Sequence, residues 1–413
     1  MRDNILVSAL RAQGADTLLV PTYTPIRTDV HDVSERRVFY GGVGVYFSQR
    51  FPIWQRAPNF LRRLLSAPVL LRSLSRLAIK NRPEDLGDLT LSVLRGEHGH
   101  QGKELDELCH WLGTEIKPDL IHLTNSLFVG IAGALGSRLS IPVVCTLQGE
   151  DLFLEGLPAA QKAQALELMR DASKNVSIFV AVSHYYRDFM AGYVGIDREC
   201  IRVVHPGIRG DSYRMTAADG AAKQTITIGY LARICQEKGV GLLIDSFSRL
   251  KALPNTDHVR LRIAGYMGPE DGAEFERHLS SLDVRVRDAI DVVGEVDFDQ
   301  KRRFLASCDL FCVPAVYREP KGMYVLEALS AGLPVVLPAH GAFPELVEAS
   351  GGGVLVEPNS VDGFARALYD LAQDSGLRQE LGARGVQSVE AYFNDRRMAC
   401  ETMEIYEEVL RGV

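Results

Sequence analysis

Two glutamates stand eight positions apart in a segment that combines a loop with a helix, Glu319-Pro-Lys-Gly-Met-Tyr-Val-Leu-Glu327. Gly322 allows the backbone to turn, and the helix formers that follow predict a helix over Met323–Ala331. The first backbone N–H groups of a helix bind phosphates and polar sugars, and carboxylates accept hydrogen bonds from sugar hydroxyls. The segment therefore predicts a site for a ligand with phosphate and hydroxyl groups. Its candidate residues are Glu319, Gly322, Met323, Tyr324 and Glu327.

A pair of cations occurs earlier in the chain, in the loop that follows the predicted strand Thr225–Tyr230. Arg233 and Lys238 are five positions apart, just ahead of a predicted helix with one apolar face. Two cations beside a helix N-terminus neutralise a diphosphate, and the planar arginine fork binds it at two points. This pair therefore predicts a diphosphate clamp.

Apolar strands alternate with helical segments along the chain, which indicates parallel sheets covered by helices on both faces. A length of 413 residues favours two domains, and we place their boundary in the polar stretch 207–224. The predicted strands of the first half are Thr17–Pro21, Leu120–Leu123, Pro142–Leu147, Ile178–Ser183 and Ile201–His205. Those of the second half are Thr225–Tyr230, Leu261–Ala264, Ile290–Val293, Leu310–Pro314 and Val335–Pro338.

The glutamate pair is followed by Ala-x3-Gly-x-Pro-Val-Val and by Pro344-Glu345. Together with the Arg-x4-Lys pair, these motifs resemble the donor-site signature of family 4 glycosyltransferases (glycosyl transferase group 1), which have the GT-B fold. The resemblance covers roughly residues 117–394. It implies an α/β protein of two Rossmann-like doubly wound domains that face each other across a cleft. The acceptor-side domain would comprise residues 1–210 with a crossing helix at 395–413, and the nucleotide-sugar domain residues 224–394.

The same resemblance implies a retaining, metal-independent hexosyltransferase of polysaccharide or glycolipid synthesis that needs no cofactor. It would move a sugar from a nucleotide-diphosphate sugar, UDP- or GDP-type, to a saccharide or lipid-linked acceptor. Glu319 would contact the transferred sugar, Glu327 the ribose, and Arg233 and Lys238 the diphosphate, while the loop at Gly265 would lie near the base. Two alternatives remain: a nucleotide-sugar epimerase of the same fold, and a protein that binds nucleotide-sugar without turnover.

Four residues that follow strands of the first half are candidates for the acceptor side, because ligands bind beyond the carboxyl ends of parallel strands. They are His122, Gln148, Asp151 and His184. Gln148 stands where the family has the histidine of His-Gly-x-Asp. Since glutamine cannot shuttle a proton near neutral pH, a mechanism that needs an acid/base histidine is not expected here. A lone histidine at a strand end is more often structural, which applies to His122 and His184.

The chain opens with a predicted amphipathic helix over Asp3–Gln13, where a GT-B domain has a strand and a glycine-rich loop. We interpret this as a missing first strand, due to a late-assigned start or a real truncation. Gly41–Gly44 predicts a tight loop at the acceptor side, together with Arg27, Thr28 and Asp29.

Charge and composition narrow the class of protein. A net charge of −7 argues against nucleic acid as a partner, and seven scattered cysteines suit reduced thiols in a cytoplasm. No transmembrane span is expected. The segment 60–82 is rich in leucine, arginine and lysine without an acidic residue, which suggests peripheral membrane contact. The alternative is a helical insertion packed on the first domain, and Pro68, which interrupts the pattern, favours it.

Overall fold

The computed structural model describes residues 1–22, 32–35, 83–214 and 225–412. The interpretations of residues 27–29, 41–44 and 60–82 therefore lie outside the described residues. The chain forms two compact units. The first unit comprises Asp3–Val204 with Ala399–Val413, and the second unit comprises His205–Met398.

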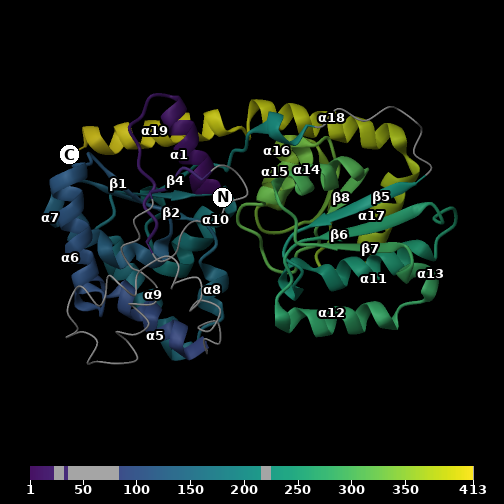
Figure 1. The fold of residues 1–413 in the computed structure, drawn as a ribbon, viewed down its shortest axis with the longest axis horizontal. Coiled ribbons are helices and arrows are strands. Elements are labelled where there is room, and N and C mark those ends of the chain that lie inside the picture. The colour runs from purple at the N-terminus through teal and green to yellow at the C-terminus, as the bar shows by residue number, and fades with distance from the viewer. Residues whose placement is uncertain (23–31, 36–82, 215–224, 413) are drawn as a thin grey trace. The chain divides into compact units, whose positions relative to one another are not determined.

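The first unit contains a four-stranded parallel sheet in the order β1-β2-β3-β4 (Figure 1). Its strands are β1 (Ile121–Leu123), β2 (Val143–Leu147), β3 (Ile178–Ala181) and β4 (Ile201–Val203). Every residue of β2 and β3 is buried, as expected for central strands of a parallel sheet. These four strands confirm the predictions for their segments.

The helices of the first unit include the predicted N-terminal helix. They are α1 (Arg2–Ala12), α5 (Pro83–Leu94), α6 (Gly102–Trp111), α7 (Ala132–Leu139), α8 (Asp151–Glu155), α9 (Ala159–Ser173) and α10 (His184–Met190). The predicted strand Thr17–Pro21 is wrong as a strand, because within the described residues only Leu19 pairs, in an isolated bridge with Ser34. Pro21 has no N–H to extend such a ladder.

The second unit contains a six-stranded parallel sheet in the order β10-β9-β8-β5-β6-β7. Its strands are β5 (Ile226–Leu231), β6 (Val259–Ala264), β7 (Ile290–Gly294), β8 (Leu310–Cys312), β9 (Val335–Pro338) and β10 (Gly353–Val356). Five of them were predicted. The sixth, β10, was missed because three consecutive glycines, Gly351 to Gly353, run into its start and predict a loop. A Cβ on Gly353 would lie 2.6 Å from the carbonyl oxygen of Val335 on β9, so close strand packing explains the glycine.

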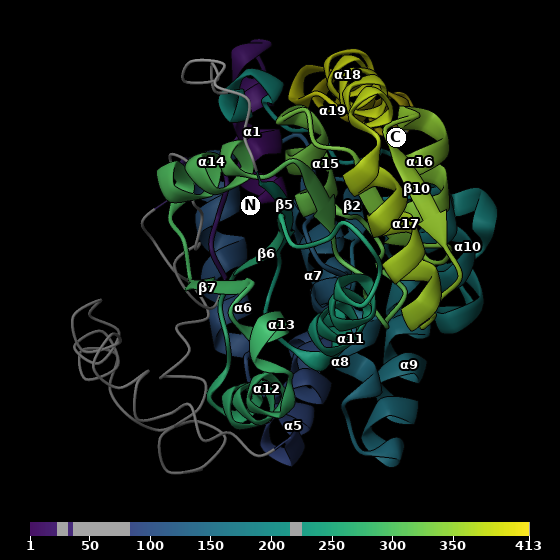
Figure 2. The same cartoon turned by 90° about the vertical axis from the view of Figure 1, so that its right-hand side faces the viewer.

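Helices connect these strands by crossovers in both directions along the sheet. They are α11 (Val240–Lys251), α12 (Pro269–Ser281), α13 (Val284–Arg287), α14 (Phe298–Ser307), α15 (Met323–Ser330), α16 (Phe343–Ser350), α17 (Val361–Gln373) and α18 (Ser375–Ala391). α11 packs against α12, α13 and α17. Figure 2 shows α11, α12 and α13 close together. α15 and α16 pack against α18. Because right-handed crossovers in opposite directions place their helices on opposite faces, the sheet is doubly wound.

The segment after β4 belongs to the second unit rather than to a linker. Ile208 pairs with Asn394 in a parallel bridge, and Tyr213 is 2% exposed. The two compact units therefore divide after Val204, upstream of the polar stretch expected to separate them. The last helix, α19 (Asp395–Arg411), begins in the second unit and continues in the first. In the part of the chain that the structure describes, no helix is long and apolar enough to cross a membrane.

Candidate functional site

The strand order of the second unit reverses direction between β5 and β8, which are hydrogen-bonded neighbours. From β5 the chain continues to β6 on one side, and from β8 it continues to β9 on the other. In open α/β sheets, ligands bind beyond the carboxyl ends of the two strands at such a reversal. The loop after β5 contains Arg233 and Lys238, and the loop after β8 contains Glu319. The fold thus places two separately predicted motifs at one position.

Glu319 is buried at this position and is held by three donors. Its Oε2 accepts hydrogen bonds from the Lys238 ammonium and, at 3.0 Å, from the Tyr324 hydroxyl. Its Oε1 accepts from the Gly322 N–H at 3.4 Å. Burial by itself raises the pKa of Glu319, but Lys238, Lys321 and Tyr324 outweigh it and hold the pKa below its ordinary value. Glu319 is therefore ionised at neutral pH.

The two loops are packed so closely that one position requires glycine. Gly239 precedes α11 with a φ of 71°, and a Cβ there would lie 1.8 Å from the carbonyl oxygen of Pro314. The Lys238 ammonium, next to this glycine, lies 4.8 Å from the ring centroid of Tyr317 and 5.1 Å from that of Tyr324. Lys238 is thus fixed by aromatic faces as well as by Glu319.

Arg233 differs from Lys238 in its environment. It is exposed, and its guanidinium has no hydrogen bond or ion pair with another described residue. Its backbone oxygen accepts a hydrogen bond from the Tyr230 hydroxyl at 2.7 Å, which anchors the loop rather than the side chain. The guanidinium can therefore reach a ligand without giving up a protein partner among the described residues.

Glu327 lies inside α15, buried, and contacts two residues that the sequence did not single out. Its Oε1 accepts hydrogen bonds from the Lys301 ammonium at 2.9 Å and from the Tyr213 hydroxyl at 3.1 Å. Lys301 is on α14 and is itself 9% exposed. The sequence does indicate that Lys301 shares the apolar face of its helix, since it lies three and four residues before Phe304 and Leu305.

Gly265 lies at the end of β6, beside the loop that carries Arg233. Its φ is 147°, and a Cβ there would lie 1.7 Å from the carbonyl oxygen of Ala232. A side chain at this position is therefore excluded by the neighbouring loop. Met323, the first residue of α15, is buried, and its N–H is among those that have no partner within the helix.

His122 has a structural environment in the first unit. Its Nδ1 lies 2.7 Å from the Tyr406 hydroxyl on α19, and its Nε2 lies 2.7 Å from the Thr146 hydroxyl on β2. Both ring nitrogens are thus engaged by the protein. This geometry ties the sheet to α19.

Gln148 is also engaged by protein groups. Its Nε2 donates to the carbonyl oxygen of Thr124 at 2.5 Å and to Asp3 Oδ2 at 3.1 Å. The carboxylate of Glu150, buried in the same loop, accepts hydrogen bonds from three backbone N–H groups and from Tyr186. Glu150 and Tyr186 were not predicted as site residues, although Glu150 stands between Gln148 and Asp151.

Asp151 contacts the same tyrosine. The Tyr186 hydroxyl lies 2.9 Å from Asp151 Oδ1, and burial raises the pKa of Asp151 above its ordinary value. Burial likewise raises the pKa of Glu150. The structure therefore brings Gln148, Glu150 and Asp151 into one partly buried polar cluster with Tyr186.

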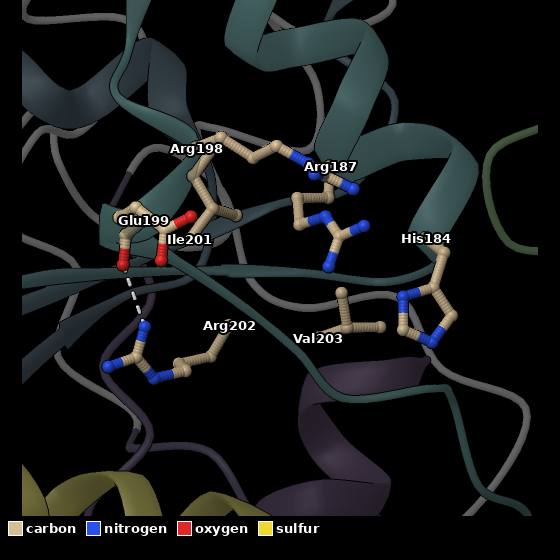
Figure 3. Close-up of a pocket in the computed structure, with 7 residues that line it drawn as sticks. All are labelled: His184, Arg187, Arg198, Glu199, Ile201, Arg202 and Val203. Carbon is tan, nitrogen blue, oxygen red and sulfur yellow. Dashed lines mark hydrogen bonds between the residues drawn. The ribbon is translucent and has the colours of Figure 1, made fainter.

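His184 lies apart from this cluster and lines a cavity of about 290 Å³ beside β4 (Figure 3). Three arginines also line the cavity: Arg187, Arg198 and Arg202. Arg187 and Arg198 both pair with Asp188, at 2.8 Å and 2.7 Å, and Arg202 pairs with Glu408 at 2.6 Å. Because acidic side chains balance these cations, the cavity has no marked positive charge.

Comparison with known families covers nearly the whole described chain. Residues 5–207 match the family described as glycosyl transferase 4-like domain, and residues 214–388 match glycosyl transferases group 1.

Among known proteins, the chain is 28% identical over 239 residues to a D-inositol 3-phosphate glycosyltransferase of Streptomyces bingchenggensis, covering 54% of this chain and 51% of that relative. It is 24% identical over 351 residues to the amylovoran biosynthesis glycosyltransferase AmsK of Erwinia amylovora, covering 75% of this chain and 83% of the relative. A phosphatidyl-myo-inositol mannosyltransferase of Mycolicibacterium smegmatis is 29% identical over 46% of this chain and 47% of its own length. The first and third matches thus span about half of each relative.

Solved structures show the same fold. The Anabaena protein HepE in complex with UDP aligns with a TM-score of 0.65 at 18% identity, over 76% of this chain and 84% of that chain. Sucrose-phosphate synthase from Thermosynechococcus elongatus aligns with a TM-score of 0.63 at 20% identity, over 76% and 80%. The two parallel α/β units are accordingly those of the GT-B fold. The chain belongs to the family 4 glycosyltransferases, a family of transferase enzymes.

Proposed function

We propose that the protein transfers a sugar, with retention of anomeric configuration, from a UDP- or GDP-sugar to a saccharide or lipid-linked acceptor. The observation that carries the proposal is the meeting of Lys238 and Glu319 beyond β5 and β8, at the reversal of strand order. A cation for the diphosphate and a carboxylate for the sugar are adjacent there, with Arg233 on the same loop as Lys238.

In this proposal the donor diphosphate is neutralised by Arg233, by Lys238 and by the N-terminus of α15. The bond between the anomeric carbon and the diphosphate oxygen breaks, and the leaving diphosphate takes the electron pair. The acceptor hydroxyl attacks the same face of the sugar, and its proton passes to the departing diphosphate. Since the charge is met by side chains, we expect no requirement for a divalent metal, which an assay with a chelator tests.

The names of relatives support the choice of substrates. The HepE structures contain UDP, UDP with glucose, and UDP-glucose, and one relative is named for transfer to phosphatidyl-myo-inositol. Those ligands and acceptors belong to those proteins. For this chain they favour a uridine diphosphate donor and an acceptor with sugar-like hydroxyls.

A thermal-shift panel with UDP, GDP, ADP and their sugar conjugates tests the donor site. A ligand at about 100 times its Kd adds roughly 2.7 kcal/mol to the unfolding free energy, which raises Tm by several degrees. We expect one nucleotide to stabilise the protein and Arg233→Ala to abolish the effect. Transfer assays with that nucleotide's sugars then establish turnover and product stereochemistry. No stabilisation by any nucleotide would refute the donor site, and binding without turnover would refute the transferase activity.

A further inference from the structure

The hydroxyl of Tyr186 lies within hydrogen-bond distance of two carboxyl groups in the first unit. It is 3.0 Å from Glu150 Oε2 and 2.9 Å from Asp151 Oδ1. A phenol carries one proton and can donate it to only one of them at a time. The oxygen of the other carboxylate then faces the phenol oxygen, and no proton lies between these two hydrogen-bond acceptors. The contact is attractive on both sides only when one of the two carboxyl groups is protonated.

The backbone decides which carboxyl group keeps its charge. Glu150 Oε2 accepts from the N–H groups of Gln148 at 2.8 Å and Gly149 at 3.0 Å, and Oε1 accepts from Ser126 at 3.2 Å. Three N–H donors favour the charged form of Glu150, although burial raises its pKa as it does that of Asp151. The phenol proton therefore goes to Glu150, and the extra proton lies on Asp151, whose Oδ1–H donates to the phenol oxygen.

The charges around the cluster favour this proton. Glu155 lies near Asp151 and adds negative charge, while Tyr193 and the buried Cys145 thiol are neutral at neutral pH. Burial raises the pKa of Asp151 by more than the Tyr186 hydroxyl and the N–H groups of Asp151 and Leu152 lower it. Within the described residues, neither Glu150 nor Asp151 forms an ion pair with lysine or arginine, whereas the exposed Glu155 pairs with Lys162 at 2.7 Å.

We propose that Glu150, Tyr186 and Asp151 hold one proton in addition to the phenol's own, and that this proton keeps Asp151 uncharged at neutral pH. Asp151 Oδ2 is then a neutral oxygen that accepts a hydrogen bond from a saccharide hydroxyl at the acceptor side. Glu150 and Tyr186 act as positioning residues that set the protonation of Asp151. The binding of a saccharide by Asp151 rests on the proposed function, whereas the protonation of Asp151 does not.

Infrared spectroscopy of the whole protein tests the proton directly, because a protonated carboxyl group absorbs apart from carboxylates. In a pH titration we expect a carboxylic acid band at neutral pH that disappears in Asp151→Asn. Glu150→Gln removes a negative charge close to Asp151, which favours the ionised form of Asp151. The band should then be lost at a lower pH than in the wild type. A band that persists unchanged in Asp151→Asn, or no such band at neutral pH, overturns the proposal.

Kinetics tests the consequence for the ligand. Asparagine mimics the uncharged carboxyl group, with its NH₂ toward Tyr186, so the alkaline fall of kcat/KM should be absent in Asp151→Asn. In the wild type this fall should be about tenfold per pH unit above the pKa of Asp151. Glu150→Gln and Tyr186→Phe should shift the pH at which kcat/KM falls, and Asp151→Ala should raise KM for the saccharide acceptor.

Tyr193→Phe is the matched control, because the Tyr193 hydroxyl donates to Glu155 at 2.7 Å on the exterior of the same unit. Its pH profile should equal that of the wild type. A profile of Asp151→Asn with the wild-type alkaline limb would contradict the role of Asp151. Absence of turnover in the wild type would refute the proposed function alone, since the infrared titration does not need activity.

Discussion

Lys238 and Glu319 are 81 residues apart in the sequence and form a buried ion pair in the second unit. The lysine side chain is 11% exposed and the carboxylate 3%. Each residue was predicted from a separate motif, one for the diphosphate and one for the sugar. In the proposed donor site, a bound diphosphate would share Lys238 with Glu319 or draw it away. Donor binding and the charge of Glu319 would thereby be coupled.

The pH dependence of stability reports on this pair. The pKa of Glu319 in the folded protein lies below its ordinary value, so the charged form is favoured by folding. The stability from Glu319 is therefore fully present above about pH 4.3, the ordinary glutamate pKa, and is lost as pH falls through the folded value. Urea unfolding should show that the difference in unfolding free energy between the wild type and Glu319→Gln is constant from neutral pH to about pH 5 and then narrows. A difference that widens on acidification would contradict the stabilising ion pair.

Arg233→Ala should lower kcat/KM for sugar transfer by about 100-fold or more, the size expected when a charge that stabilises a leaving group is removed. Tm should hardly change, because the side chain is exposed and has no described partner. Arg249→Ala serves as control, since Arg249 is exposed on α11 and pairs with Asp362 away from the loop. Near-normal transfer by Arg233→Ala, measured from initial rates, would exclude the diphosphate role.

Lys301→Met should weaken binding of a nucleoside diphosphate about tenfold, the loss of one charge-assisted hydrogen bond. The physical reason is that Lys301 contacts Glu327, which is proposed to bind the ribose. Calorimetric titration should show that binding of inorganic pyrophosphate, which has no ribose, is unchanged. Arg303→Met, an exposed change on the same helix, should bind both ligands normally. Equal weakening for both ligands in Lys301→Met would place its effect on the diphosphate instead.

His122→Ala should reduce the free energy of unfolding by about 1–3 kcal/mol, because it leaves the partly buried hydroxyls of Tyr406 and Thr146 without their partner. Nucleotide binding should be unchanged, since the contacts of His122 lie in the first unit. Tyr406→Phe removes one of the two hydrogen bonds and should cost less. Urea unfolding with a parallel nucleotide titration measures both effects. A large change in nucleotide affinity without loss of stability would show that His122 is not structural.

Local sequence determined most of the secondary structure. The strands β5, β8 and β9 and the helices α11 and α15 follow from apolar runs, β-branched residues and glycine or proline at their ends, which act over a few residues. The same local signals failed at Thr17–Pro21 and at β10, where pairing with distant strands decides the outcome. A strand is stable only through partners, and its own residues do not reveal them.

The chemistry of the site was only half visible in the sequence. Arg233, Lys238, Glu319 and Glu327 were chosen because their types and spacing suit a nucleotide-sugar. The partners of the buried carboxyl groups come from other elements: Lys301 and Tyr213 contact Glu327, and Tyr186 contacts Glu150 and Asp151. Burial and hydrogen bonding fix whether a carboxyl group is charged, and both depend on residues brought together by the fold. The sequence by itself therefore determined the family and the donor-site motifs. Only the tertiary structure decided which side chains hold them and that both ring nitrogens of His122 contact protein hydroxyls.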